Sequence, residues 1–249
     1  MGYDLHISRA LFWSYGKRYP IMEREFADLI EREPDLWFEP DRKGTRPAFV
    51  GEGGDDRIAG LPVPLGLRHF GWHSGTEGAD GGESEWLHVS NGQIQSTWPG
   101  EALIRRMAAL ARSLDAWLMG DDCELYVAAP DGTVTARERT PDDLHPALGV
   151  HPRRFLTRHA RPIPVAEWWA LVAGQPDFRV DERIEALLPS GWRLITCPPV
   201  AHWTGHPSGR PVPFFHEGDG YVEVAHVDPV TRSRMVELAA LLDAGVHDD

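Results

Sequence analysis

Two pairs of histidines have a spacing at which side chains can share a metal ion. His69 and His73 are four residues apart, and so are His202 and His206. On a helix, this spacing places both imidazoles on one face, where they can bind zinc. Glycine or proline interrupts both pairs, and helix interiors disfavour both residues. We therefore expect these histidines in loops, and we predict neither a bound metal nor another cofactor.

Motifs for nucleophilic catalysis and for phosphate binding are weak. The sequence has no Gly-x-Ser-x-Gly elbow, which would present a catalytic serine. Cys123 has acidic neighbours, whose charges disfavour the reactive thiolate. The glycine-rich stretch GEGGDD at 51–56 lacks the lysine and hydroxyl residue of a phosphate-binding loop. We therefore predict a protein that is not an enzyme.

Acidic residues give the strongest chemical signal. The chain has 38 Asp and Glu against 25 Lys and Arg, a formal net charge of −13 at pH 7. Such a field repels nucleic acid and anionic membranes and steers basic partners towards the surface, although it also favours simple solubility. We predict a partner-binding surface on three acidic stretches. The residues are Glu52, Asp55, Asp56, Glu77, Asp80, Glu83, Glu85, Asp121 and Asp122.

An internal repeat organises the chain. Residues 20–36 (PIMEREFADLIEREPDL) align without a gap with residues 162–178 (PIPVAEWWALVAGQPDF). Residues 106–116 (RMAALARSLDA) similarly match residues 234–244 (RMVELAALLDA). The matches keep the same order in both halves, and only the loop lengths differ. The sequence therefore predicts a diverged tandem duplication of one module.

The elements of one module follow from hydrophobic periodicity. Alternation at 3–9, and on both sides of Asn91-Gly92, predicts strands and a hairpin. Proline starts helices at 20–33 and 99–118, and the second carries Leu118 on its apolar face. With a strand at 123–129, each copy becomes β-α-β-β-β-α-β. We expect an α+β fold, with mostly antiparallel sheets and helices on one face.

The repeat also sets the expected domain boundaries. We place the first copy at 1–130, with a loop insertion at 38–60. A linker at 131–152 is rich in proline and aspartate and contains one short strand. The second copy, 153–249, has no segment like CELYVAA. Its sheet should therefore lack the last strand or borrow one.

Several segments resemble a family of small bacterial domains of unknown chemistry. Members open with a Tyr-Asp-Leu-x-Ile-Thr-Arg strand and carry Trp-Thr-x-His-Pro and Gly-Asp-Asp segments. The matching segments are YDLHISR (3–9), PIPVAEW (162–168), WTGHPSG (203–209) and GDDCELY (120–126). Each copy has lost one of these features, so neither is a complete member. Such domains look like immunity proteins of bacterial toxin systems.

Charge and resemblance together suggest an acidic immunity-type protein that binds and neutralises a basic bacterial toxin, such as a nuclease. The alternative is a ligand-binding protein or enzyme with a cleft between the copies near 202–209. Trp72, His202, Trp203 and His206 would line that cleft. Charged residues interrupt the N-terminal apolar run, and no apolar run reaches 18 residues. We therefore expect a cytoplasmic protein that avoids membranes and nucleic acid.

Overall fold

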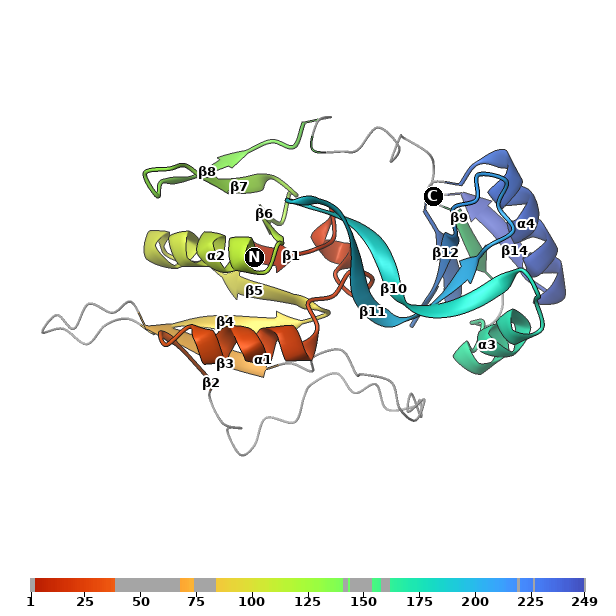
Figure 1. The fold of residues 1–249 in the computed structure, drawn as a ribbon, viewed down its shortest axis with the longest axis horizontal. Coiled ribbons are helices and arrows are strands. Elements are labelled where there is room, and N and C mark those ends of the chain that lie inside the picture. The colour runs from red at the N-terminus through yellow and green to blue at the C-terminus, as the bar shows by residue number, and fades with distance from the viewer. Residues whose placement is uncertain are drawn as a thin grey trace, which may run out of the picture. The chain divides into compact units, whose positions relative to one another are not determined.

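The computed structural model describes most of the chain and has an α+β architecture. The described residues are 3–38, 68–73, 84–140, 143, 154–157, 162–218, 220–225 and 227–248. They form two compact units (Figure 1). Unit 1 comprises Met1–Arg139 and Glu185–Pro198, and unit 2 comprises Thr140–Ile184 and Pro199–Asp249. No described helix is long and apolar enough to cross a bilayer.

Unit 1 contains an eight-stranded sheet with the order β2-β3-β4-β5-β1-β6-β7-β8. Its strands are β1 (Asp4–Ser8), β2 (Leu36–Phe38), β3 (Arg68–His73), β4 (Ser84–Ser90), β5 (Gln93–Thr97), β6 (Trp117–Gly120), β7 (Leu125–Ala128) and β8 (Val134–Arg137). Its helices are η1 (Trp13–Tyr15, a 3-10 turn), α1 (Glu23–Arg32) and α2 (Glu101–Ser113). All of these neighbouring strands pair antiparallel.

The core of unit 1 lies between its sheet and the helices α1 and α2. Leu5 and Ile7 alternate with polar residues along β1 and are fully buried, as expected for a strand with one face in a core. The helix residues in the same cluster include Phe26, Leu29, Leu103, Met107 and Leu110. Both helices therefore cover the sheet face that carries Leu5 and Ile7.

Unit 2 contains a six-stranded sheet with the order β10-β11-β12-β13-β9-β14. Its elements are β9 (Arg154–Thr157), α3 (Val165–Ala173), β10 (Phe178–Leu188), β11 (Gly191–Trp203), β12 (Val212–Glu217), β13 (Tyr221–Val224), α4 (Pro229–Leu241) and β14 (Gly245–Asp248). Strands and helices follow one another along the chain as β1 to β6 do with α1 and α2. The six shared strand positions also have the same order in both sheets.

The module differs from the prediction in its strand count. Four strands, rather than three, lie between the two helices of each unit. The sequence conceals β2 because it has only three residues and no room for alternation. The strand expected within the linker is present as β8, pairs with β7 and so extends the sheet of unit 1. In the described part of unit 2, the sheet ends at β14.

Helix α2 is shorter than predicted. It ends at Ser113, and Leu118 lies in β6 rather than on the helix. Asp115 adopts the left-handed conformation, with φ of 49°, and the Ala116 N–H bonds back to the Ala111 carbonyl oxygen at 2.8 Å. Glycine usually occupies such a cap, so the aspartate in the sequence did not indicate that the helix ends here. Asp243 ends α4 with φ of 50°.

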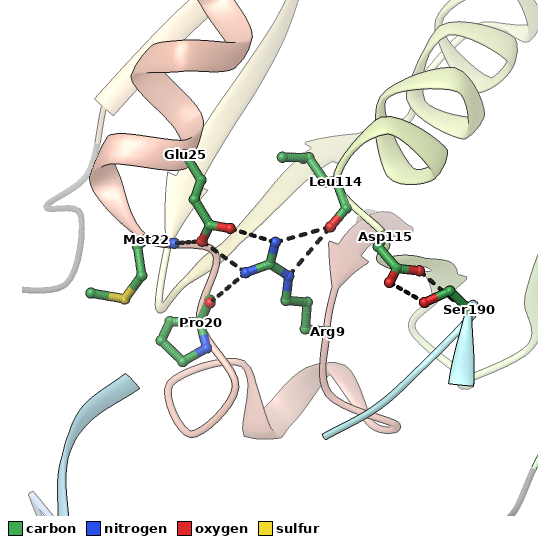
Figure 2. Close-up of polar contacts among 7 residues, drawn as sticks. All are labelled: Arg9, Pro20, Met22, Glu25, Leu114, Asp115 and Ser190. Carbon is green, nitrogen blue, oxygen red and sulfur yellow. Dashed lines mark hydrogen bonds and ion pairs between the residues drawn. The ribbon is translucent and has the colours of Figure 1, made fainter. Parts of the chain in front are cut away.

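A long hairpin contributes its outer half to unit 1. Strands β10 and β11 have 11 and 13 residues, and their outer segment, Glu185–Pro198, is grouped with unit 1. The Ser190 N–H and hydroxyl both donate to the Asp115 carboxylate, and the Trp117 Nε1–H donates to the Leu187 carbonyl oxygen at 3.2 Å. The left-handed residue that ends α2 therefore also holds the hairpin turn (Figure 2).

Arg9, which follows β1, joins three elements of unit 1. Figure 2 shows its guanidinium between the Glu25 carboxylate and the carbonyl oxygens of Leu114 and Pro20. Two nitrogens bond the carboxylate at 2.7 and 2.8 Å, and Leu114 accepts bonds of 3.0 and 3.3 Å. Glu25 also accepts the Met22 N–H at the start of α1. Burial opposes ionisation of Glu25, but the bonds from Arg9 and Met22 lower its pKa.

Each unit also contains an arginine clamp, in which an arginine of the second helix bonds side chains that follow the first helix. In unit 1, Arg106 of α2 donates to Asp35 and to Glu33 beyond the end of α1. In unit 2, Arg234 of α4 donates to Asp177 and Gln175 at 2.7 and 2.8 Å. Each clamp ties the second helix of its unit to the chain that leaves the first. The partners occupy equivalent positions in the internal alignment.

Replacing Arg9 with methionine should lower the free energy of unfolding by about 3 kcal/mol. The change leaves two buried carbonyl oxygens without this donor and leaves the Glu25 carboxylate with only the Met22 N–H. The Glu25 side chain is 40% exposed, so water should recover part of the loss. Arg9→Lys should be intermediate, because lysine cannot bond a carboxylate in a bidentate way. Urea denaturation measures both variants, and an unchanged midpoint for Arg9→Met would contradict the assigned role.

Candidate functional site

The predicted acidic surface can be assessed at one end of β6. Glu52, Asp55, Asp56, Glu77, Asp80 and Glu83 lie outside the described residues. Glu85 lies in β4, where the structure describes only its backbone pairing with Trp72 of β3. Asp121 and Asp122 lie in the turn between β6 and β7. This turn is therefore the part of the predicted surface whose geometry can be analysed.

A pocket of about 560 Å³ opens beside the turn. Three acids, two aromatic residues, one cysteine and one arginine line it. They are Asp122, Glu124, Glu138, Tyr3, Phe12, Cys123 and Arg139. All of these residues belong to unit 1. Asp122 was predicted as a site residue from the sequence. Glu138 was not, because it falls within the predicted linker and reaches the pocket only through the pairing of β8 with β7.

Backbone geometry explains why Glu124 and Tyr3 meet here. A Cβ atom on Gly120 would lie 2.0 Å from the Glu124 Oε1 and 2.1 Å from the Tyr3 hydroxyl. A residue with a Cβ atom would therefore displace these two oxygens from their positions. The turn closes when the Cys123 N–H donates to the Gly120 carbonyl oxygen at 2.9 Å. Cys123 has φ of 64°, a left-handed conformation that costs energy for a residue with a Cβ.

Asp121 anchors this turn rather than projecting from it. Its carboxylate accepts the Asp4 N–H at 2.9 Å and lies 3.0 Å from the His6 Nε2. Its carbonyl oxygen accepts the Trp13 Nε1–H at 3.0 Å. The imidazole of His6 stacks on Trp13, with 4.6 Å between ring centroids. Burial opposes ionisation, but the bonds from His6 and Asp4 lower the pKa of Asp121. Asp122, by contrast, is exposed.

Asp4, His6 and Asp121 also form a cluster with the donor types of a divalent metal site. Their ligand atoms lie within 4.8 Å of one another. A metal on the Nε2 of His6 would move the ring proton to Nδ1, which is buried and has no hydrogen-bond partner among the described residues. Metal-bound histidines nearly always donate from their second nitrogen. The geometry therefore favours a hydrogen-bonded anchor over a metal site.

The sequence predicted that the histidines with metal-like spacing lie in loops. Not all of them do. His69 and His73 lie in β3, and His202 lies in β11. His206 is in the turn after β11. A strand places side chains four residues apart more than 12 Å from each other along its length. Neither pair lies on a helix, so the four-residue spacing does not place the two imidazoles on one helix face.

Trp72, His202, Trp203 and His206 were predicted to line an alternative pocket, but those whose side chains are described have divergent environments. Trp203 is 5% exposed in the helix-side core, where its Nε1–H donates to Asp177 at 2.7 Å. His202 is its neighbour in the strand and so faces the other side of the sheet. His206 makes an edge contact with Trp203, with 5.5 Å between ring centroids. The side chain of Trp72 lies outside the described residues.

His206 belongs to a hydrogen-bonded chain that caps α4. Its Nε2 lies 2.9 Å from the Asp228 carboxylate, and its Nδ1 lies 2.7 Å from the Ser208 hydroxyl. Asp228 is the N-cap of α4 and accepts the Thr231 N–H at 2.7 Å. Burial opposes ionisation, but the bonds from Thr231 and His206 lower the pKa of Asp228 to about 2. The chain resembles a catalytic triad in composition, but its geometry serves a helix cap.

The imidazole ring of His202 is buried and lacks normal hydrogen bonds to the described residues. The residue is 6% exposed, and neither nitrogen makes a hydrogen bond of normal geometry within the described residues. Burial lowers its pKa, and the nearby positive charge of Arg179 lowers it further. The Asp181 carboxylate and the Arg183 backbone oppose these effects without reversing them. His202 therefore resists protonation in the folded protein.

Comparisons with known proteins give no relative for this chain. No protein-family model matches it, and neither a curated protein nor a solved structure matches it. The resemblance inferred from the sequence motifs therefore has no support from these comparisons.

Protonation of His202 should make the protein less stable as the pH falls below about 6.5. There the unfolded chain binds a proton that the folded chain resists, at a cost of at most about 1.4 kcal/mol per pH unit. His202→Leu should reduce this loss. Denaturant unfolding at pH 7.5 and pH 5.5 measures the difference. Equal losses in wild type and His202→Leu would show that His202 does not titrate as described.

Proposed function

We propose that the chain is an acidic immunity-type protein that binds and neutralises a basic bacterial toxin, such as a nuclease. The observation that supports this function best is the pocket at the β6–β7 turn. Its lining has three carboxylates and only one basic group. Acidic inhibitors commonly attract cationic active sites by presenting such charge, which speeds association.

Two of the three acids at the pocket make no contact through their carboxylates that would hold the described fold together. Asp122 and Glu138 are exposed, and their carboxylates make no hydrogen bond or ion pair within the described part of the chain. Structural acids in the same unit behave differently: Glu25 and Asp35 each bond a buried or half-buried arginine. Charges that serve no internal partner are available to an external one. Rim charges of this kind act mainly on the rate of association.

We also propose that the two units are diverged copies of one module. The shared strand order, the paired arginine clamps and the matching left-handed aspartates support this origin. The pocket depends on Glu124 beside β7 and on Glu138 after β8. In the described part of unit 2, the sheet has no counterpart of these two strands. On this view, partner binding specialised in the first copy after the duplication.

The first test is capture of the partner from the native host. Tagged protein should retain a stoichiometric basic protein at low salt and lose it at high salt, because screening weakens exposed charge pairs. Mass spectrometry identifies what co-elutes. Absence of any partner at low salt would contradict this function and would redirect attention to small ligands.

With the partner in hand, Asp122→Asn/Glu138→Gln should weaken binding about tenfold at low salt. The loss should come mainly from slower association and should shrink at high salt. Asp28→Asn/Glu31→Gln is the matched control, because it removes the same charge from exposed positions on α1. Surface plasmon resonance measures both rates. Equal effects of the two double variants would show that only net charge matters.

A further inference from the structure

We infer that the pocket at the β6–β7 turn receives one guanidinium or ammonium side chain of the partner. This inference rests on the proposed function and specifies the chemistry of its contact. It follows from an unsatisfied acceptor, from two aromatic rings and from the balance of charge in the pocket.

The unsatisfied acceptor is a carboxylate oxygen of Glu124. Its Oε2 is buried and has no hydrogen-bond partner among the described residues. The other oxygen lies over Gly120, beside the Tyr3 hydroxyl. Burial raises the pKa of Tyr126, and the negative charge of Glu124 and a side-chain hydrogen bond with that residue raise it further, so Oε2 is the oxygen of Glu124 that is left for another donor. A buried acceptor without a donor is costly, and a charged N–H donor would satisfy it with a strong hydrogen bond.

The aromatic rings favour an organic cation over a bare metal ion. Tyr3 and Phe12 line the pocket, and ring faces attract guanidinium and ammonium groups. The protein already contains one such contact here: the Arg139 guanidinium carbon lies 5.2 Å from the centroid of Phe12. A planar guanidinium can lie along a ring and still bond a carboxylate at its edge.

The charge of the pocket favours a positively charged ligand group, and its volume limits the size of that group. Asp122, Glu124 and Glu138 outnumber Arg139, and the anchored carboxylate of Asp121 lies next to them along the chain. An anion would therefore be repelled. A volume of about 560 Å³ lies within the range of small-ligand sites and is large enough for one side chain.

Cys123 provides a local probe of this pocket. It lines the pocket and is half-buried, whereas Cys197, the other cysteine of the chain, is fully buried. The rate of thiol modification by a cationic and an anionic methanethiosulfonate reagent can therefore be compared at one position. Because both reagents attack the same thiolate, their rate ratio cancels its population and reports the local potential.

Relative to free cysteine, the cationic reagent should be favoured about tenfold at low salt, and the preference should vanish at high salt. Asp122→Asn/Glu138→Gln should reduce the ratio, and Asp28→Asn/Glu31→Gln should leave it unchanged. N-acetyl-Gly-Arg-Gly amide at millimolar concentration should slow labelling by a neutral reagent, whereas its citrulline analogue, which carries no positive charge, should not. A ratio equal to that of free cysteine, or equal protection by both peptides, would overturn the inference.

The outcomes separate this inference from the proposed function. A captured basic partner that leaves Cys123 fully reactive would support the function and contradict the pocket as its contact. Cation-selective labelling and peptide protection without any protein partner would contradict the function but support the cation pocket. Protection of Cys123 by a divalent cation instead of the arginine peptide would overturn the inference in favour of a metal.

Discussion

The buried guanidinium of Arg9 is the constraint on which the architecture of unit 1 depends. Its hydrogen bonds fix the end of β1 against the start of α1 and the last turn of α2. Phe12 and Trp13 follow three and four residues later. Trp13 then bonds the Asp121 carbonyl oxygen, and Phe12 lines the pocket. The same contact that organises the core therefore also sets the position of the candidate site, so stability and recognition share a foundation.

Charge has two separate uses in this unit. Glu25, Glu33 and Asp35 neutralise arginines and hold helices in place. Asp122 and Glu138 have no such internal partner within the described residues and lie exposed at one turn. Asp121 lies at the boundary between the two groups. Its carboxylate contacts Asp4 and His6, whereas the neighbouring Asp122 has no partner among the described residues. This division lets the surface become strongly acidic without weakening the ion pairs that support the fold.

Local sequence patterns predicted the helices and strands well. They did not predict the candidate site, because pairing between strands brings its residues together. Asn91 and Gly92 form the expected hairpin turn, with φ of 53° and 72°, and α1 occupies Glu23–Arg32 within the predicted 20–33. Asp115 ends α2 without the usual glycine, so the helix was extended too far. Glu138 joins Tyr3 only because β8 folds back on β7. No periodicity records such a pairing, since it is decided by sheet edges rather than by neighbouring residues.

The hairpin formed by β10 and β11 has a consequence for the order in which the chain matures. Asp115 and Ser190 are separated by 75 positions, yet they meet in unit 1. During synthesis from the amino terminus, the ribosome must therefore make much of the second half before the first unit receives all of its contacts. Until then, unit 1 lacks the contacts that Asp115 and Trp117 make with the hairpin, so its last hydrogen bonds form only after residues of the second half have been synthesised.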